Sequence, residues 1–187
     1  MKLYFGLVIK FDKKVNSKLK ELTHYVAKKY KTKAAFNDPK GPHITMAYFD
    51  TAVKTEDIKK IINRIRVKLS KAGEFNVKID GIRSFRKERD GIVNYVVYIR
   101  PVKNKHLSKI YRICNRETKK YKIWPPFKIF VPHITLARKD LDKTTFYNIL
   151  KEFNGYNLQM NARINCIYSM TRCTRKEKWH EQKLLLT

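Results

Sequence analysis

The stretch GPHITMAYFD at residues 41–50 has a close copy, VPHITLARKD, at residues 131–140. The six residues from proline to alanine, 42–47 and 132–137, differ at one position, where the first copy has Met46 and the second Leu136. The copies lie 90 residues apart in a chain of 187 and contain two of its five histidines. Such a repeat indicates a duplication in which each half carries one histidine motif.

Each copy has the alternation of a β-strand with one apolar and one polar edge. Because successive side chains of a strand point to opposite faces, His43 and Thr45 face one way and the apolar residues after each of them face the other. The second copy repeats this pattern with His133 and Thr135. If the halves pack about a pseudo-twofold axis, two imidazoles and two hydroxyls converge on one small anionic group.

Around the motifs, the sequence predicts strands and amphipathic helices in alternation, without a long Gly, Ser or Pro linker. Apolar residues at helical spacing predict helices at 15–30, 58–69, 107–114 and 146–153. Strands are predicted at 2–10, 43–49, 75–86, 92–100, 131–138, 156–160, 163–170 and 180–186. We expect an α+β fold in which residues 1–187 form a single bilobal domain. Two sheets rich in antiparallel pairing, with flanking helices, would surround a central groove.

The charge balance narrows the class of partner. Lys and Arg number 43 against 16 acidic residues, a formal charge of +27, and the chain has 11 Tyr, 10 Phe and 2 Trp. A charge this one-sided repels itself, so a polyanion such as RNA or an oligonucleotide is the favoured partner. The alternative is a lysine-rich surface that is merely solvated.

The cysteines and the hydropathy pattern bear on the compartment. The three cysteines, Cys114, Cys166 and Cys173, have no metal-ligand spacing, which predicts free thiols in a reducing compartment. No apolar run reaches the length of a membrane span. We therefore expect a cytoplasmic protein that does not bind membranes, and we expect a monomer.

The paired motifs predict acid–base chemistry on a phosphodiester. Cleavage without a metal needs a base to activate the nucleophile and an acid to protonate the leaving oxygen, and histidine fills either role near neutral pH. His43 and His133 are therefore the predicted catalytic pair, with Thr45 and Thr135 donating to the phosphate oxygens. Arg138, directly after the second motif, is a candidate phosphate clamp. A zinc site is disfavoured, because two histidines lack a third ligand at a recognisable spacing, and we expect no cofactor.

These motifs resemble the signature of the 2H phosphoesterase superfamily, two copies of His-x-Thr/Ser-x with an apolar last residue. The segment KYKIWPPFKIFVPHITLARKD (120–140) is similar to the stretch before the second motif of the 2′-5′ RNA ligase type, and residues 163–186 resemble its closing strands. The first motif departs from that type. Gly-Pro precedes it where Asn-Leu is common, and Ala-Tyr-Phe follows it where Lys-Phe is common.

The resemblance implies a bilobal duplicated fold and metal-independent opening of a 2′,3′-cyclic phosphate to a 2′-phosphate. His43 and His133 would be the acid–base pair, with their roles unassigned, and 2′-5′ RNA ligation is a further activity of that type. Two alternatives remain open. One is cleavage of 2′,5′-linked or cyclic signalling oligonucleotides, and the other is a non-catalytic RNA-binding module.

Four aromatic residues are candidates for contact with a nucleobase, since stacking tolerates any base. Phe85, Trp124 and Phe127 are the first three, and core packing is the alternative explanation for each. Tyr48 is the fourth, although a regular strand would direct its side chain into the core together with Met46.

Overall fold

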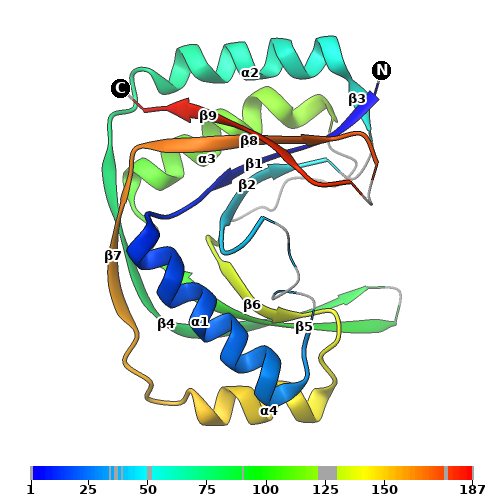
Figure 1. Cartoon of the computed structure of the whole chain (residues 1–187), viewed down its shortest axis with the longest axis vertical. Coiled ribbons are helices and arrows are strands. Elements are labelled where there is room, and N and C mark those ends of the chain that lie inside the picture. The colour runs from blue at the N-terminus through cyan, green and yellow to red at the C-terminus, as the bar shows by residue number, and fades with distance from the viewer. Residues whose placement is uncertain are drawn as a thin grey trace.

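The computed structural model describes residues 2–33, 35, 38, 40–49, 52–89, 91–121, 130–174 and 177–186 (Figure 1). Its strands are β1 (Lys2–Ile9), β2 (Ile44–Tyr48), β3 (Val53–Lys54), β4 (Phe75–Arg89), β5 (Ile92–Pro101), β6 (Ile134–Arg138), β7 (Gln159–Ile164), β8 (Cys166–Arg172) and β9 (His180–Leu185). Its α-helices are α1 (Lys13–Tyr30), α2 (Thr55–Leu69), α3 (Lys105–Thr118) and α4 (Lys143–Glu152). A short 3₁₀ helix spans Lys119–Tyr121. The predicted helices and strands occur in the predicted order, but β7 (Gln159–Ile164) overlaps the strand predicted at 156–160 only at residues 159 and 160, and β3 was not predicted. Residues 122–129, which include Pro125 and Pro126, lie outside the described residues.

The strands form two antiparallel sheets that are built alike. The first has the order β2-β1-β8-β9, with β3 also pairing with β1, and the second has the order β6-β5-β4-β7. In each sheet a histidine motif strand, β2 or β6, lies at one end of the order and pairs with a longer strand, β1 or β5. Two motifs far apart in sequence thereby occupy equivalent positions in the two lobes.

Two of the helices pack on the lobe opposite to the strand that precedes them. Helices α2 and α3 pack on each other and contact the first sheet, α2 through β1 and α3 through β2. Helices α1 and α4 contact the second sheet, α1 through β6 and α4 through β5. Consequently the helix that follows β1 belongs to the opposite lobe, as does the helix that follows β5. Figure 1 shows the first sheet with α2 and α3 at the top and the second with α4 at the bottom.

Local sequence signals account for the helix boundaries. The Asp12 carboxylate accepts a hydrogen bond from the Val15 amide at 2.9 Å, and Asn104 and Asp142 cap α3 and α4 in the same way. Buried stripes at helical spacing, such as Ile58 to Leu69 on α2, place each helix on its sheet.

The state of the cysteines and the hydropathy of the helices were also predicted from the sequence. In the described part of the chain Cys114, Cys166 and Cys173 form no disulfide, and the first two are buried. Across the described residues, no helix is both long and apolar enough to cross a membrane.

Candidate active site between the two lobes

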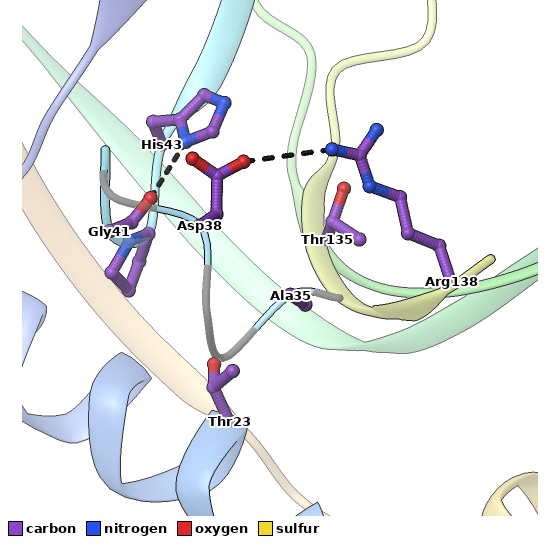
Figure 2. A pocket seen from close by; sticks show the side chains of 8 residues that line it. Thr23, Ala35, Asp38, Gly41, His43, Thr135 and Arg138 are labelled. Atoms are coloured by element: carbon purple, nitrogen blue, oxygen red, sulfur yellow. Dashed lines mark hydrogen bonds and ion pairs between the residues drawn. The ribbon is translucent and has the colours of Figure 1, made fainter. Parts of the chain in front are cut away.

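The two motif histidines make the same backbone contact. His43 precedes β2 directly, and its Nδ1 lies 2.7 Å from the carbonyl oxygen of Gly41 (Figure 2). His133 precedes β6, and its Nδ1 lies 3.0 Å from the carbonyl oxygen of Val131. A carbonyl only accepts, so each Nδ1 carries the hydrogen and donates it. In the neutral imidazole this leaves the Nε2 lone pair of both rings available for proton transfer.

A turn before β2 brings two further charged residues to His43. Gly41 has a φ of 66°, a left-handed conformation that favours glycine, and its amide donates to the Asp38 carbonyl at 2.9 Å. The Asp38 carboxylate accepts from the Lys40 amide at 3.0 Å and forms an ion pair with the Lys40 ammonium at 2.8 Å. The turn therefore places one carboxylate and one ammonium beside the imidazole.

A pocket joins this turn to the second motif strand. It is lined by residues of α1, the turn and β6, namely Thr23, Ala35, Asp38, Gly41, Pro42, His43, Thr135 and Arg138. Figure 2 shows the Asp38 carboxylate between the His43 ring and the Arg138 guanidinium. The pocket thus brings the histidine of one motif together with the threonine of the other. His133 and Thr45 are not among its lining residues.

Arg138 links the two motifs electrostatically. Its Nη2 lies 3.6 Å from Asp38 Oδ2, and its Nε is buried without a hydrogen-bond partner in the described part of the chain. The charge of Arg138 contributes to lowering the pKa of both His43 and His133. One guanidinium therefore lies close enough to act on both rings.

The surroundings of both imidazoles favour the neutral form. Burial is the main cause that lowers the pKa of His43, to about 4, and Lys40 and Arg138 lower it further. The hydrogen bond to Gly41 and the charge of Asp38 oppose this shift. Burial also lowers the pKa of His133 below 6.5, against its hydrogen bond to Val131. The downward shift is the larger one at His43.

The surroundings of His133 are aromatic. The ring centroid of Phe85 lies 5.6 Å from that of His133, and the Tyr98 centroid lies 5.9 Å away, both edge to face. Phe85 and Tyr98 also contact each other, with centroids 5.5 Å apart. The predicted substrate-binding residue Phe85 therefore lies at the second motif histidine, where its contacts are with protein rings.

A β-bulge at the same place in both motifs corrects one prediction. Leu7 and Val8 of β1 pair with Ala47 and Thr45, so that Met46 is an extra residue without a partner in the strand pairing. In the second sheet the same shift leaves Leu136 without a pairing partner. The extra residue reverses the alternation that follows it.

Tyr48 is consequently turned out of the core. The residue is 37% exposed, and the prediction that it points inward with Met46 is wrong because the strand is not regular. Arg138 is the equivalent residue of the second motif, and its side chain is 40% exposed. The bulge thus presents one side chain past each motif, a phenol in one lobe and a guanidinium in the other.

The remaining predicted residues fall into two groups. Thr45 and Thr135 are half-buried, each two residues after its histidine on the same edge. Trp124 and Phe127 lie outside the described residues. Sequence reasoning missed Asp38 and Lys40, although both stand in the segment DPKGPH directly before the first histidine. Among the described residues, no three or more His, Cys, Asp or Glu side chains gather as a metal site would require.

The fold and this site define a two-lobed protein with one histidine motif per lobe. Residues 12–173 match the family model of the 2′-5′ RNA ligase superfamily. The chain therefore belongs to the 2′-5′ RNA ligase superfamily, whose members are 2H phosphoesterases. No curated protein sequence matches the chain.

Solved structures share the fold at low sequence identity. LigT of Escherichia coli in its apo form has a TM-score of 0.63 and 15% identity, over 98% of this chain and 95% of LigT. The protein TT0787 of Thermus thermophilus has a TM-score of 0.59 and 14% identity, over 100% and 98%. Usb1 of Kluyveromyces marxianus with uridine monophosphate has a TM-score of 0.52 and 13% identity, over 98% of each chain. These similarities establish the bilobal LigT-like fold, with its two antiparallel sheets and four helices.

Proposed function

We propose that this protein is a metal-independent phosphodiesterase that opens 2′,3′-cyclic phosphate ends of RNA to a 2′-phosphate. The observation that carries the proposal is the matched contact of His43 and His133, each with its Nδ1 at a backbone carbonyl oxygen, together with the charge of Arg138 near both rings. Two imidazoles with available Nε2 atoms on opposite lobes suit an in-line displacement, which needs one proton acceptor and one proton donor on opposite sides of phosphorus.

The roles of the two histidines follow from their surroundings. The larger downward pKa shift keeps His43 neutral at a pH where His133 is still partly protonated. We therefore assign His43 as the base and His133 as the acid. A water oxygen attacks phosphorus and gives its proton to His43 Nε2, the bond from phosphorus to O3′ breaks, and His133 Nε2 donates a proton to O3′.

Thr45, Thr135 and Arg138 bind the phosphate in this proposal. The threonine hydroxyls donate to non-bridging oxygens, and the guanidinium stabilises the negative charge that builds up as water attacks. Arg138 Nη2 already lies 3.6 Å from an oxyanion of the protein itself, Asp38 Oδ2 (Figure 2). Two neighbours of similar fold were solved with ligands of related chemistry, LigT with 3′-AMP and Usb1 with uridine monophosphate.

The test is incubation of a short RNA ending in a 2′,3′-cyclic phosphate with the protein in EDTA. Mass spectrometry and sensitivity to a phosphatase resolve the products. Conversion to a 2′-phosphate end, lost in His43→Ala and His133→Ala, supports the proposal. Binding without conversion contradicts it, and 2′,5′-linked and cyclic oligonucleotides tested next in the same assay then separate another phosphodiesterase from a non-catalytic RNA-binding module. A 2′-5′ joined product from an RNA with a 5′-hydroxyl end would add ligation in the reverse direction.

A further inference from the structure

A group of aromatic and cationic side chains adjoins His43 on the first lobe. Trp179, directly before β9, has its ring centroid 6.2 Å from that of Tyr48, with the rings tilted by 66°. The Arg172 guanidinium carbon lies 4.3 Å from the Trp179 centroid, and Lys40 Nζ lies 5.5 Å from it. We call Lys40, Tyr48, Arg172 and Trp179 the Trp179 cluster.

Three different segments build the Trp179 cluster beside the catalytic motif. Tyr48 ends β2 and is turned outward by the bulge, while Arg172 ends β8 and Trp179 precedes β9. Lys40 lies three residues before His43 and is close enough to affect its pKa. Through Lys40, the cluster therefore adjoins the surroundings of the His43 ring.

The charges of the cluster favour an anion. Burial lowers the pKa of Lys40, and the nearby charges of Arg138 and Arg172 lower it further, while Asp38 opposes the shift. Three cations thus lie near one another, with Lys40 only 15% exposed. Like charges held this closely repel one another, and a phosphate group placed among them relieves the repulsion.

The aromatic part of the cluster suits a nucleobase. Base stacking on Trp or Tyr is independent of sequence, and arginine combines stacking on aromatic faces with recognition of phosphate. An RNA with a 2′,3′-cyclic end extends only in the 5′ direction. The phosphate that joins the terminal nucleoside to the preceding nucleotide is therefore the next anion along the chain.

We propose that the Trp179 cluster is a second nucleotide subsite, in which Lys40 and Arg172 bind the phosphate 5′ of the terminal nucleoside and Trp179 stacks on the preceding base. This inference rests on the proposed function and specifies its substrate as an oligonucleotide, in preference to a nucleoside cyclic phosphate. Catalysis at the terminal phosphate does not require Arg172 or Trp179, whereas binding of a longer RNA does.

The kinetic test compares adenosine 2′,3′-cyclic monophosphate with a five-nucleotide RNA that ends in the same cyclic nucleotide. Trp179→Ala and Arg172→Gln should each lower kcat/KM for the RNA by about tenfold, mainly through KM. The mononucleotide rate should stay within about twofold of wild type. Equal losses on both substrates would assign the cluster a structural role, and unchanged rates on both would overturn the proposal.

Two variants in the second lobe are matched controls. Arg163→Gln removes an exposed guanidinium of β7 that pairs with Glu74, and Tyr147→Ala removes a ring that is 54% exposed on α4. Neither should discriminate between the two substrates. If Arg163→Gln lowers RNA turnover as much as Arg172→Gln, the effect is general charge attraction and the subsite is rejected.

A binding measurement separates this inference from the proposed catalysis. Trp124→Phe leaves Trp179 as the sole tryptophan of the chain, so that its fluorescence reports on the cluster. A five-nucleotide RNA with a 3′-phosphate should quench this fluorescence and bind at least about tenfold tighter than adenosine 3′-monophosphate. Binding without quenching, or equal affinity for both ligands, overturns the subsite whether or not cyclic ends are hydrolysed. Quenching without turnover of cyclic ends would sustain the subsite and reject the proposed reaction.

Discussion

The two motif regions, residues 41–48 and 131–138, share a backbone and differ in what surrounds it. Each histidine donates to a carbonyl two residues back, and each strand has its bulge at the same residue. His43 lies beside Asp38 and Lys40, whereas His133 is enclosed by Phe85 and Tyr98. Duplication thus provided two equivalent proton-transfer groups, and the divergence of their neighbours makes one more difficult to protonate than the other.

The contact between each histidine and a backbone carbonyl also involves different backbone conformations in the two motifs. Gly41 supplies its carbonyl from a positive φ, while Val131 is not among the described residues with positive φ. The residue that the bulge turns outward also differs, Tyr48 in the first lobe and Arg138 in the second. The first motif therefore has a polar turn beside its histidine and a phenol past its bulge, whereas the second has aromatic rings beside its histidine and a guanidinium past its bulge.

The largest effect should come from removing either motif histidine, because both lobes share this feature. His43→Ala and His133→Ala should each lower kcat by about 10²–10⁴-fold, because each removes a proton-transfer group. Both rings are only half-buried, so circular dichroism should show both variants folded. His24→Ala, on the exposed face of α1, is the matched control and should retain wild-type turnover. Retained activity in either motif variant would end the assignment of paired roles.

The next effect tests the residue past each bulge. Arg138→Met should lower kcat/KM by about 10–100-fold, since a charge-assisted hydrogen bond to the phosphate is lost. Tyr48→Met, at the equivalent position, should change it by only about threefold, because no charge is removed. Steady-state kinetics on the cyclic-ended RNA measures both. Similar losses in the two variants would show that the lobes contribute equally to phosphate binding.

The threonines should behave alike. Thr45→Val and Thr135→Val each remove one neutral donor, so each should lower kcat/KM by about tenfold, with similar thermal stability. If the two hydroxyls bind separate oxygens, the double variant should lower kcat/KM by a factor of about the product of the two single losses. Kinetics of the two single variants and the double variant provides this check, and a loss confined to one threonine would contradict the symmetric arrangement.

The smallest expected effect is on the pH at which the activity is highest. The base must be neutral, which requires a pH above the His43 pKa of about 4, and the acid must be protonated, which requires a pH below the lowered pKa of His133. The pH profile of kcat/KM should therefore be bell-shaped, with its maximum below about pH 6.5. The kcat maximum should lie at higher pH, because the bound phosphate favours the imidazolium. A flat profile from about pH 4 to 9 would contradict this assignment.

The substitution Asp38→Asn tests the contribution of one neighbouring charge to the pKa of His43. Its carboxylate raises the pKa of His43, so its loss should lower that pKa further and move the acidic limb of kcat/KM to lower pH. NMR titration of the two motif histidines measures this directly, with His133 as the internal reference. An equal shift at both rings, or a shift of His133 alone, would place Asp38 in a different role.

Much of the fold and site could be predicted from the chain because the signals were local. The repeated hexapeptide, the alternation around His43 and His133, and the apolar stripes of the helices depend on residues close in sequence. The signals for Asp38 and for the outward Tyr48 were not local. The first needed the turn that carries Asp38 towards Arg138, and the second needed the register of β1 against β2.

By itself the sequence determined the duplication, the α+β class, the identity of the two motif histidines and threonines, and a strongly basic surface. Only the tertiary structure decided which helix covers which sheet, where each strand bulges, and which groups surround each imidazole. The physical reason is that strand period and helix period are properties of neighbouring residues, whereas pairing register, desolvation and ion pairs arise between residues far apart in the chain.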